Sequence, residues 1–500
     1  MSFKQPVQDV RQVLLFATSV DESIPSDADV RVVSEVMDSL DWSALESSYS
    51  DIGCPAYPPR MLAKVLVYAY SKGIRSSRKI EDLLENDKRY MWLAEGLKPD
   101  HNTIARFRKT KYAQFECLFS DSVRLCAEAG LVDLNVVSVD STKIASCASK
   151  RSLYDQARVS AAVERILAEA DDVDAAEDAL YGDGNGRELP DDLKDPAKRK
   201  AKLEALAKRL EDEKLKNTSS SEPDSRVMKV SGKLRPGYSM QAAVDASNQV
   251  IVGMQVSQCA SDCGKLRSML EQVTANTGLS CDVALADSGY SDEETFAWLE
   301  QSGQEAILAP KEHPKNKRND LFSSRCFLGS DEADELICPA GRRLVFTREF
   351  RAGSGRYKTY AATGCGSCSF HKQCVSSGRG SRRVSVSCVR ELRERMRKRL
   401  TDADGRRLFA LRKQTVEPVF GQMKANMRFD RFRAWGKSGA SAESALICIA
   451  HNVLKCARSR VADVSACFAR TSAALVESIR TAVGHMTLIA KKSVAIQASF

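Results

Sequence analysis

Apolar residues recur at helical spacing through the first part of the chain. The pattern is clear in MLAKVLVYAY (61–70), SRKIEDLLEN (77–86) and HNTIARFRKTK (101–111), where one face of each segment is apolar. Breaks at Gly73 and from Leu97 to Asp100 separate these segments. We therefore expect residues 1–133 to form an all-helical domain, a bundle of helix-turn-helix type, in which Asp100 or Asn102 caps the last helix.

A different pattern begins at Val136, where short runs rich in valine and other apolar residues predict strands. The strongest signal is a hairpin, in which two runs are separated by Ser247-Asn248. Helical segments alternate with the later runs. The expected strands are Val136 to Thr142, Ser239 to Ala246, Gln249 to Ser257, Asp282 to Ala286 and Ala306 to Ala309, and the expected helices are Lys265 to Ala275 and Asp292 to Gln301.

Two polar stretches interrupt this series. Residues 150–224 are acidic and alanine-rich at first and basic later, which predicts two helices with a loop between them. Residues 311–388 form a second, cysteine-containing insertion. The order of elements predicts an α/β core with a mixed sheet and helices on its faces, formed by residues 134–149, 225–310 and 389–460. The tail, 461–500, has helical spacing but carries no chemistry that we can assign.

Three acidic residues stand out against this pattern. Asp140 and Asp287 each close an apolar run, and Glu417 lies on a predicted helix far downstream. A ribonuclease-H-like core collects metal-binding acids in this order. Carboxylates are the ligands that Mg²⁺ favours, and a pair of divalent ions can activate a nucleophile and stabilise the leaving oxygen of a phosphodiester. We therefore predict a Mg²⁺ or Mn²⁺ site at the edge of the sheet, where α/β folds gather ligands.

Each acid also has a plainer interpretation. Asp140 could form an Asx turn with Thr142, Asp287 could begin a turn at Gly289, and Glu417 could be a solvent-facing acid. Placement of all three in the predicted core favours the metal site.

Positive charge is concentrated rather than spread. The net charge is +9, and the stretch from Ser376 to Lys413 alone has thirteen basic and four acidic residues. Such a stripe suits a polyphosphate partner, although a solvated basic helix has the same composition. A second basic segment is the last helix of the N-terminal domain, where Arg106, Arg108 and Lys109 predict DNA contacts; a purely structural bundle is the alternative.

Four cysteines of the second insertion have a spacing that suits a metal. Cys338, Cys365, Cys368 and Cys374 include one tight C-x-x-C pair, which predicts a structural zinc site of the ribbon kind. Unliganded thiols or a redox pair are the alternatives, and His371 could replace one thiol. Most of the sixteen cysteines are scattered singly, which is typical of a reducing compartment. With no apolar run long enough to span a membrane and no secretory signal, we expect a soluble cytoplasmic protein.

Several separate motifs resemble the DDE transposases of bacterial insertion sequences, the group with an N-terminal helical domain and a transposase DDE domain. The similar segments, in order, are VDSTKI, EPDSRVMK, GYSMQAAVDAS, ADSGYSDEETF, CPAG, CGSC, TVEPVFGQMK and HNVLK. They extend from about Pro58 to Lys455.

This resemblance implies a function and a set of residues. Asp140, Asp287 and Glu417 match the catalytic acids of the family, and the implied reaction is cleavage at the ends of the element followed by strand transfer into target DNA. The implied partner is double-stranded DNA, held by a homodimer. A metal-dependent nuclease without joining activity, and a non-catalytic DNA-binding protein derived from a transposase, are the alternatives.

The helix that carries Glu417 matches the family's Tyr, Arg, Glu, Lys signature only in part. Lys424 follows Glu417 on the same helix face and could contact a DNA phosphate. The signature would place Tyr at 410 and Arg at 413, where this chain has Ala410 and Lys413. Arg412 lies one place earlier. Pro418 also predicts a kink or a new helix start directly after Glu417.

Overall fold

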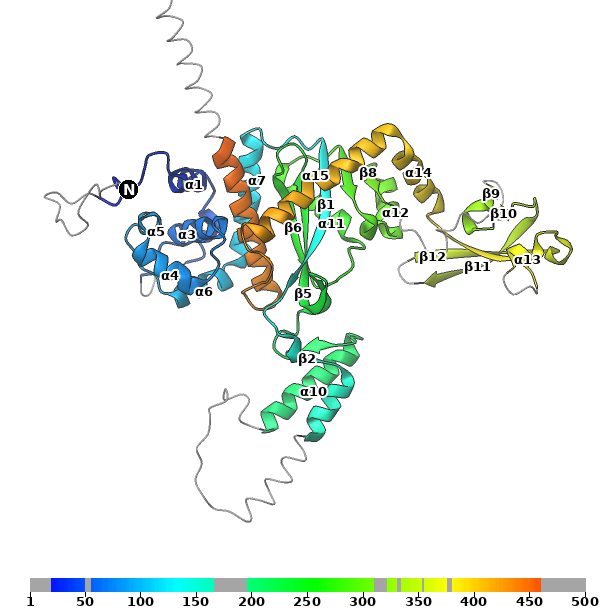
Figure 1. Ribbon diagram of the computed structural model, residues 1–500, viewed down its shortest axis with the longest axis horizontal. Coiled ribbons are helices and arrows are strands. Elements are labelled where there is room, and N and C mark those ends of the chain that lie inside the picture. Colours follow the sequence, from blue (N-terminus) through cyan, green and yellow to red (C-terminus); the bar gives the residue numbers. More distant parts are fainter. Residues whose placement is uncertain are drawn as a thin grey trace, which may run out of the picture.

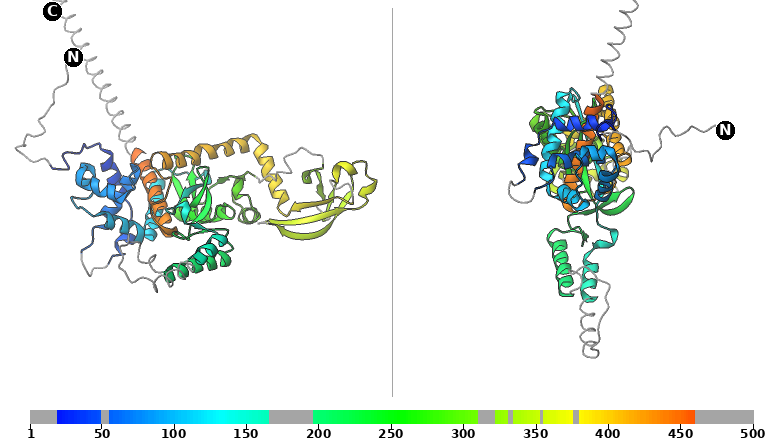
Figure 2. Two further views of the ribbon diagram at one scale, coloured as in Figure 1. Left: turned by 60° about the horizontal axis from the view of Figure 1, so that its bottom comes forward. Right: turned by 90° about the vertical axis from the view of Figure 1, so that its left-hand side faces the viewer.

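The computed structural model describes residues 19–49, 55–165, 196–309, 322–330, 334–352, 355–375 and 380–459. Figure 1 shows a central sheet with the N-terminal helices on one side and a second, smaller sheet projecting on the other. A pair of helices extends below the central sheet, as both views of Figure 2 also show. The tail 461–500 and residues 166–195 of the charged insertion lie outside the described residues.

Helices occupy all three periodic stretches of the N-terminal part. They pack around buried side chains such as Leu66, Tyr68 and Phe115, which share one core with the central sheet. Asp100 caps α6 by accepting a hydrogen bond from the N–H of Thr103 at 2.9 Å. The helices are α1 (Asp29–Asp38), α2 (Ser43–Glu46), α3 (Pro59–Ser71), α4 (Ser77–Asn86), α5 (Lys88–Leu93), α6 (His101–Thr110) and α7 (Tyr112–Glu128).

The central sheet is mixed, as the order of strands predicts. Its strands are β1 (Val136–Ala145), β4 (Arg226–Val230), β5 (Lys233–Asp245), β6 (Ile251–Ser257), β7 (Val283–Ala286) and β8 (Glu305–Leu308). The long β5 pairs antiparallel with β1 on one side and with β4 and β6 on the other. On its other side β1 pairs parallel with β7, which pairs parallel with β8.

Helices cover both faces of this sheet. On one face, α11 (Lys265–Thr277) packs closely against β6 at Gly253. A Cβ at this position would contact the side chains of Ala243, Met269 and Val273. On the other face, α15 (Ala403–Ala425) crosses β1, β5 and β7 (Figure 1). Because successive residues of a strand point to opposite faces, Val139, paired with Ala243, faces α11, and Asp140 faces α15.

The strand β1 is longer than its apolar run. It continues to Ala145 because its partner β5 supplies hydrogen bonds along the whole length. Asp140 therefore lies in the middle of the strand, and the prediction that it stands at the end of the strand is wrong. The neighbouring strand β7 ends earlier, and its last residue, Ala286, pairs with Val139.

The first insertion forms a small unit of its own. Strands β2 (Leu153–Tyr154) and β3 (Thr218–Ser219) pair at its base, next to the short η1 (Lys150–Ser152). Residues 156–165 are helical, and α10 (Pro196–Asp212) lies beside them (Figure 1). Val159, Leu206 and Leu210 make a separate apolar cluster.

The second insertion contains a five-stranded antiparallel sheet in the order β13-β12-β11-β10-β9. The strands are β9 (Leu328–Ser330), β10 (Glu335–Ile337), β11 (Arg343–Ala352), β12 (Gly355–Ala362) and β13 (Arg383–Ser387), with η4 (Ser324–Cys326), η5 (Cys365–Ser367) and α13 (His371–Cys374) in the connections. The chain then returns to the core through α14 (Arg390–Thr401) and α15, and residues 436–459 form another helix.

Among the described helices, none combines the length and the apolar character that a membrane crossing requires.

Candidate active site

Asp140 and Asp287 lie beside each other at one edge of the central sheet. Asp287 directly follows β7, and the register of β1 with β7 brings it next to Asp140. Next to them α15 packs Leu408, Phe409 and Leu411 near Leu285 of β7.

The carboxylate of Asp140 is mostly buried and takes part in two interactions. It accepts a hydrogen bond from the N–H of Ser141 at 2.7 Å, and Nη1 of Arg412 lies 2.8 Å from its Oδ2. Burial raises the pKa of Asp140, and the negative charges of Asp287 and Asp262 raise it further, while the Ser141 N–H and Arg412 oppose this shift. Asp140 is thus an acid whose charge needs a cation nearby.

Asp287 holds the turn that follows β7. Its Oδ1 accepts a hydrogen bond from the N–H of Gly289 at 2.7 Å at the start of η2 (Ser288–Tyr290). The plainer interpretation of Asp287 as a turn residue therefore describes a real contact. That contact uses one oxygen and leaves the carboxylate beside Asp140.

Glu417 reaches the same region from α15. Its Oε1 lies 4.0 Å from Nη2 of Arg412, so a single guanidinium connects Glu417 with Asp140. The helix is continuous from Ala403 to Ala425, with Pro418 inside it, and the predicted new start at Pro418 is wrong. Because proline has no N–H, the carbonyl of Gln414 lacks its helical donor, and the side-chain amide of Gln249 donates to it instead at 3.0 Å.

The two adjacent basic residues of α15 differ in exposure. Arg412 is half-buried against Asp140, whereas Lys413 is exposed on the same side of the helix as Glu417 and Lys424. The exposed face of α15 thus presents two ammonium groups beside the Glu417 carboxylate.

A fourth acid, Asp262, lies at the site although we did not predict it. Its Oδ1 accepts hydrogen bonds from Nζ of Lys143 at 2.9 Å and from the amide of Gln241 at 2.8 Å. Its Oδ2 lies 3.2 Å, and Oδ1 of Asp287 2.8 Å, from the point that a Cβ of residue 289 would occupy. Gly289 therefore allows the two carboxylates to approach each other.

The strand directions contain a signal for Asp262. Both β1 and β6 run antiparallel to β5, so β6 ends at the same edge of the sheet as β7. Asp262 follows β6 as Asp287 follows β7.

The oxygen ligands at this edge suit a hard divalent cation. Asp140, Asp287 and Glu417 supply carboxylates from two neighbouring strands and a helix, which fits Mg²⁺ or Mn²⁺ in chemical type. As the side chains stand, the described part of the chain contains no group of three or more His, Cys, Asp or Glu residues arranged to hold a metal ion.

The basic residues of α6 differ in exposure. Arg106 and Lys109 are exposed. Arg108 is buried, and its Nη1 donates to the hydroxyl of Tyr70 and to the carbonyl of Arg75, both at 3.0 Å. Arg108 therefore contributes to the interior, where a DNA phosphate cannot reach it.

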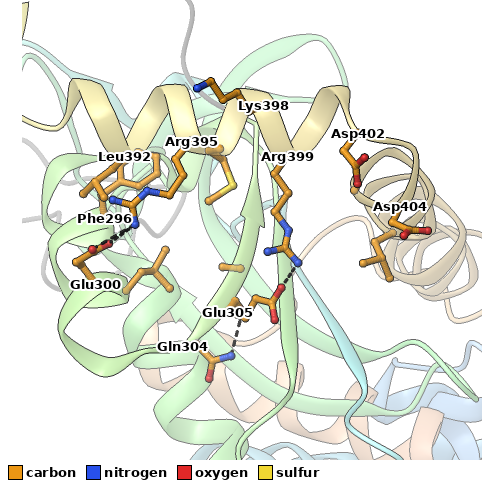
Figure 3. A pocket seen from close by; sticks show the side chains of 15 residues that line it. Phe296, Glu300, Gln304, Glu305, Leu392, Arg395, Lys398, Arg399, Asp402 and Asp404 are labelled. Carbon is orange, nitrogen blue, oxygen red and sulfur yellow. Dashed lines mark hydrogen bonds and ion pairs between the residues drawn. The ribbon is translucent and has the colours of Figure 1, made fainter. Parts of the chain in front are cut away.

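Much of the basic stripe is paired with acids. On α14, Arg395 and Arg399 bind Glu300 and Glu305 of the core, and Arg397 binds Glu394. The first two pairs line a hollow of about 720 Å³ between α12 (Glu293–Ser302), β8 and α14 (Figure 3). Glu305 begins β8, at the edge of the sheet opposite to Asp287, so the hollow is separate from the acids.

The four cysteines of the second insertion come together. Cys338, Cys365, Cys368 and Cys374, with His371, line one small cavity of about 20 Å³. Burial raises the pKa of Cys374, and the neighbouring thiols raise it further, against the effect of Arg382. The insertion thus gathers the thiols that the sequence spacing singled out.

Acids at one edge of a mixed sheet, facing a helix that carries a further acid, define a candidate metal-dependent site on an α/β fold. Two family matches agree with this class. Residues 337–457 match the family described as transposase DDE domain, and residues 18–110 match the family described as transposase domain (DUF772). The resemblance to DDE-type transposases is confirmed, and these families indicate a transposase in general terms.

Among solved structures, the chain is similar to the piggyBac transposase synaptic complex with hairpin DNA, determined by cryo-EM. The TM-score is 0.33 and the sequence identity 10%, over 87% of this chain and 75% of that chain. No curated protein matches the chain.

Proposed function

We propose that this protein is a DNA transposase that cleaves DNA at the ends of an insertion element and joins them to target DNA, with divalent metal ions as cofactors. The observation that carries the proposal is the meeting of Asp140 and Glu417 at one guanidinium, beside Asp287, although the three are far apart in sequence. A nuclease that cuts without joining would use the same acids.

We also infer that the central sheet is a ribonuclease-H-like core. The order β6-β5-β1-β7-β8, with β5 antiparallel to its neighbours and β7 and β8 parallel to β1, supports this inference. All-helical segments precede it, and the two insertions follow β1 and β8.

The residues divide into those that hold metal and those that hold DNA. Asp140, Asp287 and Glu417 would hold Mg²⁺ or Mn²⁺, which when bound supplies an activated oxygen nucleophile and stabilises the leaving oxygen. Lys413 and Lys424 would contact the DNA backbone close to Glu417. Arg106 and Lys109 offer a second contact on α6, and a homodimer would hold two ends together.

The test is to neutralise each acid without changing its size. Asp140→Asn, Asp287→Asn and Glu417→Gln should each lower magnesium-dependent cleavage of DNA with element ends by about a thousandfold or more, because they remove metal ligands. Binding to the same DNA should hardly change, since no phosphate contact is lost. The matched control is Asp404→Asn, at an exposed carboxylate of α15, which should keep full activity.

The outcomes separate the candidate functions. If cleavage persists in all three variants, the proposed metal site is refuted. Cleavage by the unaltered protein without joining of pre-cleaved ends indicates a nuclease, and tight binding without any magnesium-stimulated breaks indicates a non-catalytic DNA-binding protein.

We propose further that Cys338, Cys365, Cys368 and Cys374 hold a structural zinc ion, because all four line one cavity. A closed thiolate site would stabilise a sheet whose own core is small. The purified protein should contain one zinc per chain by mass spectrometry of the metal, and Cys365→Ser should lose it. Cys259→Ser, at an exposed thiol outside the cavity, should retain it, and a zinc-free unaltered protein would refute the proposal.

A further inference from the structure

Arg412 is the cation that the structure places between two of the proposed metal ligands. Its Nη1 lies 2.8 Å from Oδ2 of Asp140, and its Nη2 lies 4.0 Å from Oε1 of Glu417. The side chains of Arg412 and Asp140 are 13% and 18% exposed, whereas that of Glu417 is 54% exposed. The guanidinium thus extends from the interior of the site to its rim.

The guanidinium is only partly satisfied there. It makes one short charge-assisted bond, to Asp140, and a longer contact with Glu417. Its Nε is buried and has no hydrogen-bond partner among the described residues. A guanidinium has five N–H donors. The Nε of Arg75 also has no partner among the described residues, but its other nitrogens donate to two backbone carbonyls and a carboxylate, so Arg412 makes fewer hydrogen bonds than Arg75.

The carboxylates, in contrast, need positive charge. Asp140 is surrounded by the negative charges of Asp287 and Asp262. Lys143 is bound to Asp262 on the other face of the sheet, which leaves Arg412 as the cation in contact with both Asp140 and Glu417. A divalent ion that binds these two acids would use the same oxygens and would repel the guanidinium.

We propose that Arg412 and the divalent metal ion compete for Asp140 and Glu417, and that metal binding releases the Arg412 guanidinium to a DNA phosphate. This inference rests on the metal-dependent function proposed above. Release would move the guanidinium toward the exposed face of α15, where Glu417 and the neighbouring Lys413 lie. Arg412 is then a positioning residue. It occupies the Asp140 and Glu417 carboxylates until metal and DNA bind.

Competition predicts a gain of metal affinity when Arg412 is neutralised. Binding of Mn²⁺ to the full chain without DNA is measured by electron paramagnetic resonance of the free ion. Arg412→Gln should lower the dissociation constant by about fivefold or more, the usual size of a coupling between two ligands. The matched control Arg395→Gln removes an exposed guanidinium bound to Glu300 and should leave Mn²⁺ affinity unchanged.

DNA binding supplies the second readout. With Mn²⁺ present, the salt dependence of binding to element-end DNA should be less steep by about one phosphate contact in Arg412→Gln than in the unaltered protein. If Arg412 only fixed α15 on the sheet, its substitution would neither make this slope less steep nor raise the affinity for the metal ion.

The outcomes distinguish this inference from the proposed function. If the unaltered protein binds no Mn²⁺ at millimolar concentration, the metal-dependent function fails. If it binds Mn²⁺ and Arg412→Gln binds it equally or more weakly, only the competition is refuted. Should Arg412→Gln not fold, Arg412→Lys, which keeps the charge but cannot span both acids, replaces it. This variant should bind Mn²⁺ more tightly than the unaltered protein, and equal affinity would overturn the inference.

Discussion

Asp262 shows how strongly a single residue can depend on its neighbours. Lys143 and Gln241 bind one of its oxygens, and Tyr290 donates in turn to the Gln241 side chain. The side chains of Lys143 and Asp262 are 21% and 15% exposed, so each is the main charge partner of the other. This network connects β1, β5, η2 and the loop before α11 on the face opposite to α15.

Removing either charge of this pair should destabilise the protein. Asp262→Asn and Lys143→Met should each lower the free energy of unfolding by about 2 kcal/mol, because the remaining group loses a charged hydrogen bond. The double variant should lose less than the two single losses together, as measured by urea unfolding. Glu271→Gln, in the exposed pair with Arg267, should cost under about 1 kcal/mol. Additive losses at 143 and 262 would show that the two side chains are not coupled.

The sequence predicts part of the candidate site because strand ends and acids can be read from it. Asp287 follows from this rule, whereas Asp140 closes only the apolar run and not the strand. Glu417 is predicted as an acid on a downstream helix, and the resemblance adds its catalytic role. Which of Arg412 and Lys413 contacts the acids could not be predicted, since the rotation of α15 about its own axis decides it. Asp262 escaped prediction because it lies in a loop without periodicity, and only the strand directions reveal its place.

At the scale of single elements, the sequence predicts which helices and strands form better than it predicts where they begin and end. The strand pattern identified β1, yet the pairing partner β5 sets its length. The expected helix begins at Asp292, but Asp292 is the residue whose side chain caps α12, which begins at Glu293. We interpreted the basic stripe of α14 as a surface that could bind a polyphosphate, because the acids that pair with it, Glu300 and Glu305, lie on other elements.

The helix 436–459 is fixed to the β5–β6 hairpin by the HNVLK motif. The ring of His451 shares a hydrogen bond with the carbonyl of Gln249 at 2.8 Å, and Asn452 binds both backbone groups of Ile251. Lys455 reaches the side chain of Gln249 at 3.2 Å. The motif thus has a structural role in addition to marking the resemblance.

His451 should make the protein sensitive to acid. Burial lowers its pKa to about 4 from 6.5. Between these two pH values the unfolded chain binds a proton that the folded protein excludes, so stability falls as the pH decreases through this window. The contribution should reach about 3 kcal/mol near pH 4. Relative to His451→Gln, unaltered protein should lose this amount between pH 7 and 4 in urea unfolding, and parallel curves would show that His451 does not titrate there.

At the scale of the whole molecule, a buried charge network joins the N-terminal helices to the core. Glu443, on the helix 436–459, is fully buried and binds Arg75 and the hydroxyl of Tyr70. Its other oxygen accepts hydrogen bonds from the N–H groups of Arg433 and Ala434. Burial raises the pKa of Tyr70 to about 12, so its hydroxyl stays protonated as a donor. DNA held by α6 would thereby be kept at a fixed position relative to the acids of the sheet.

Neutralising Glu443 should weaken the coupling between the unfolding of the N-terminal helices and the unfolding of the core. Glu443→Gln leaves Arg75 without a carboxylate in the interior, which should cost about 3–5 kcal/mol of stability. Glu300→Gln removes an acid from the exposed pair with Arg395 and should cost under about 1 kcal/mol. In urea unfolding followed by circular dichroism, the Glu443 variant should also lose its single transition, since the N-terminal helices can then unfold before the core. A variant that unfolds in one transition at the original midpoint would show that apolar packing alone joins the two parts.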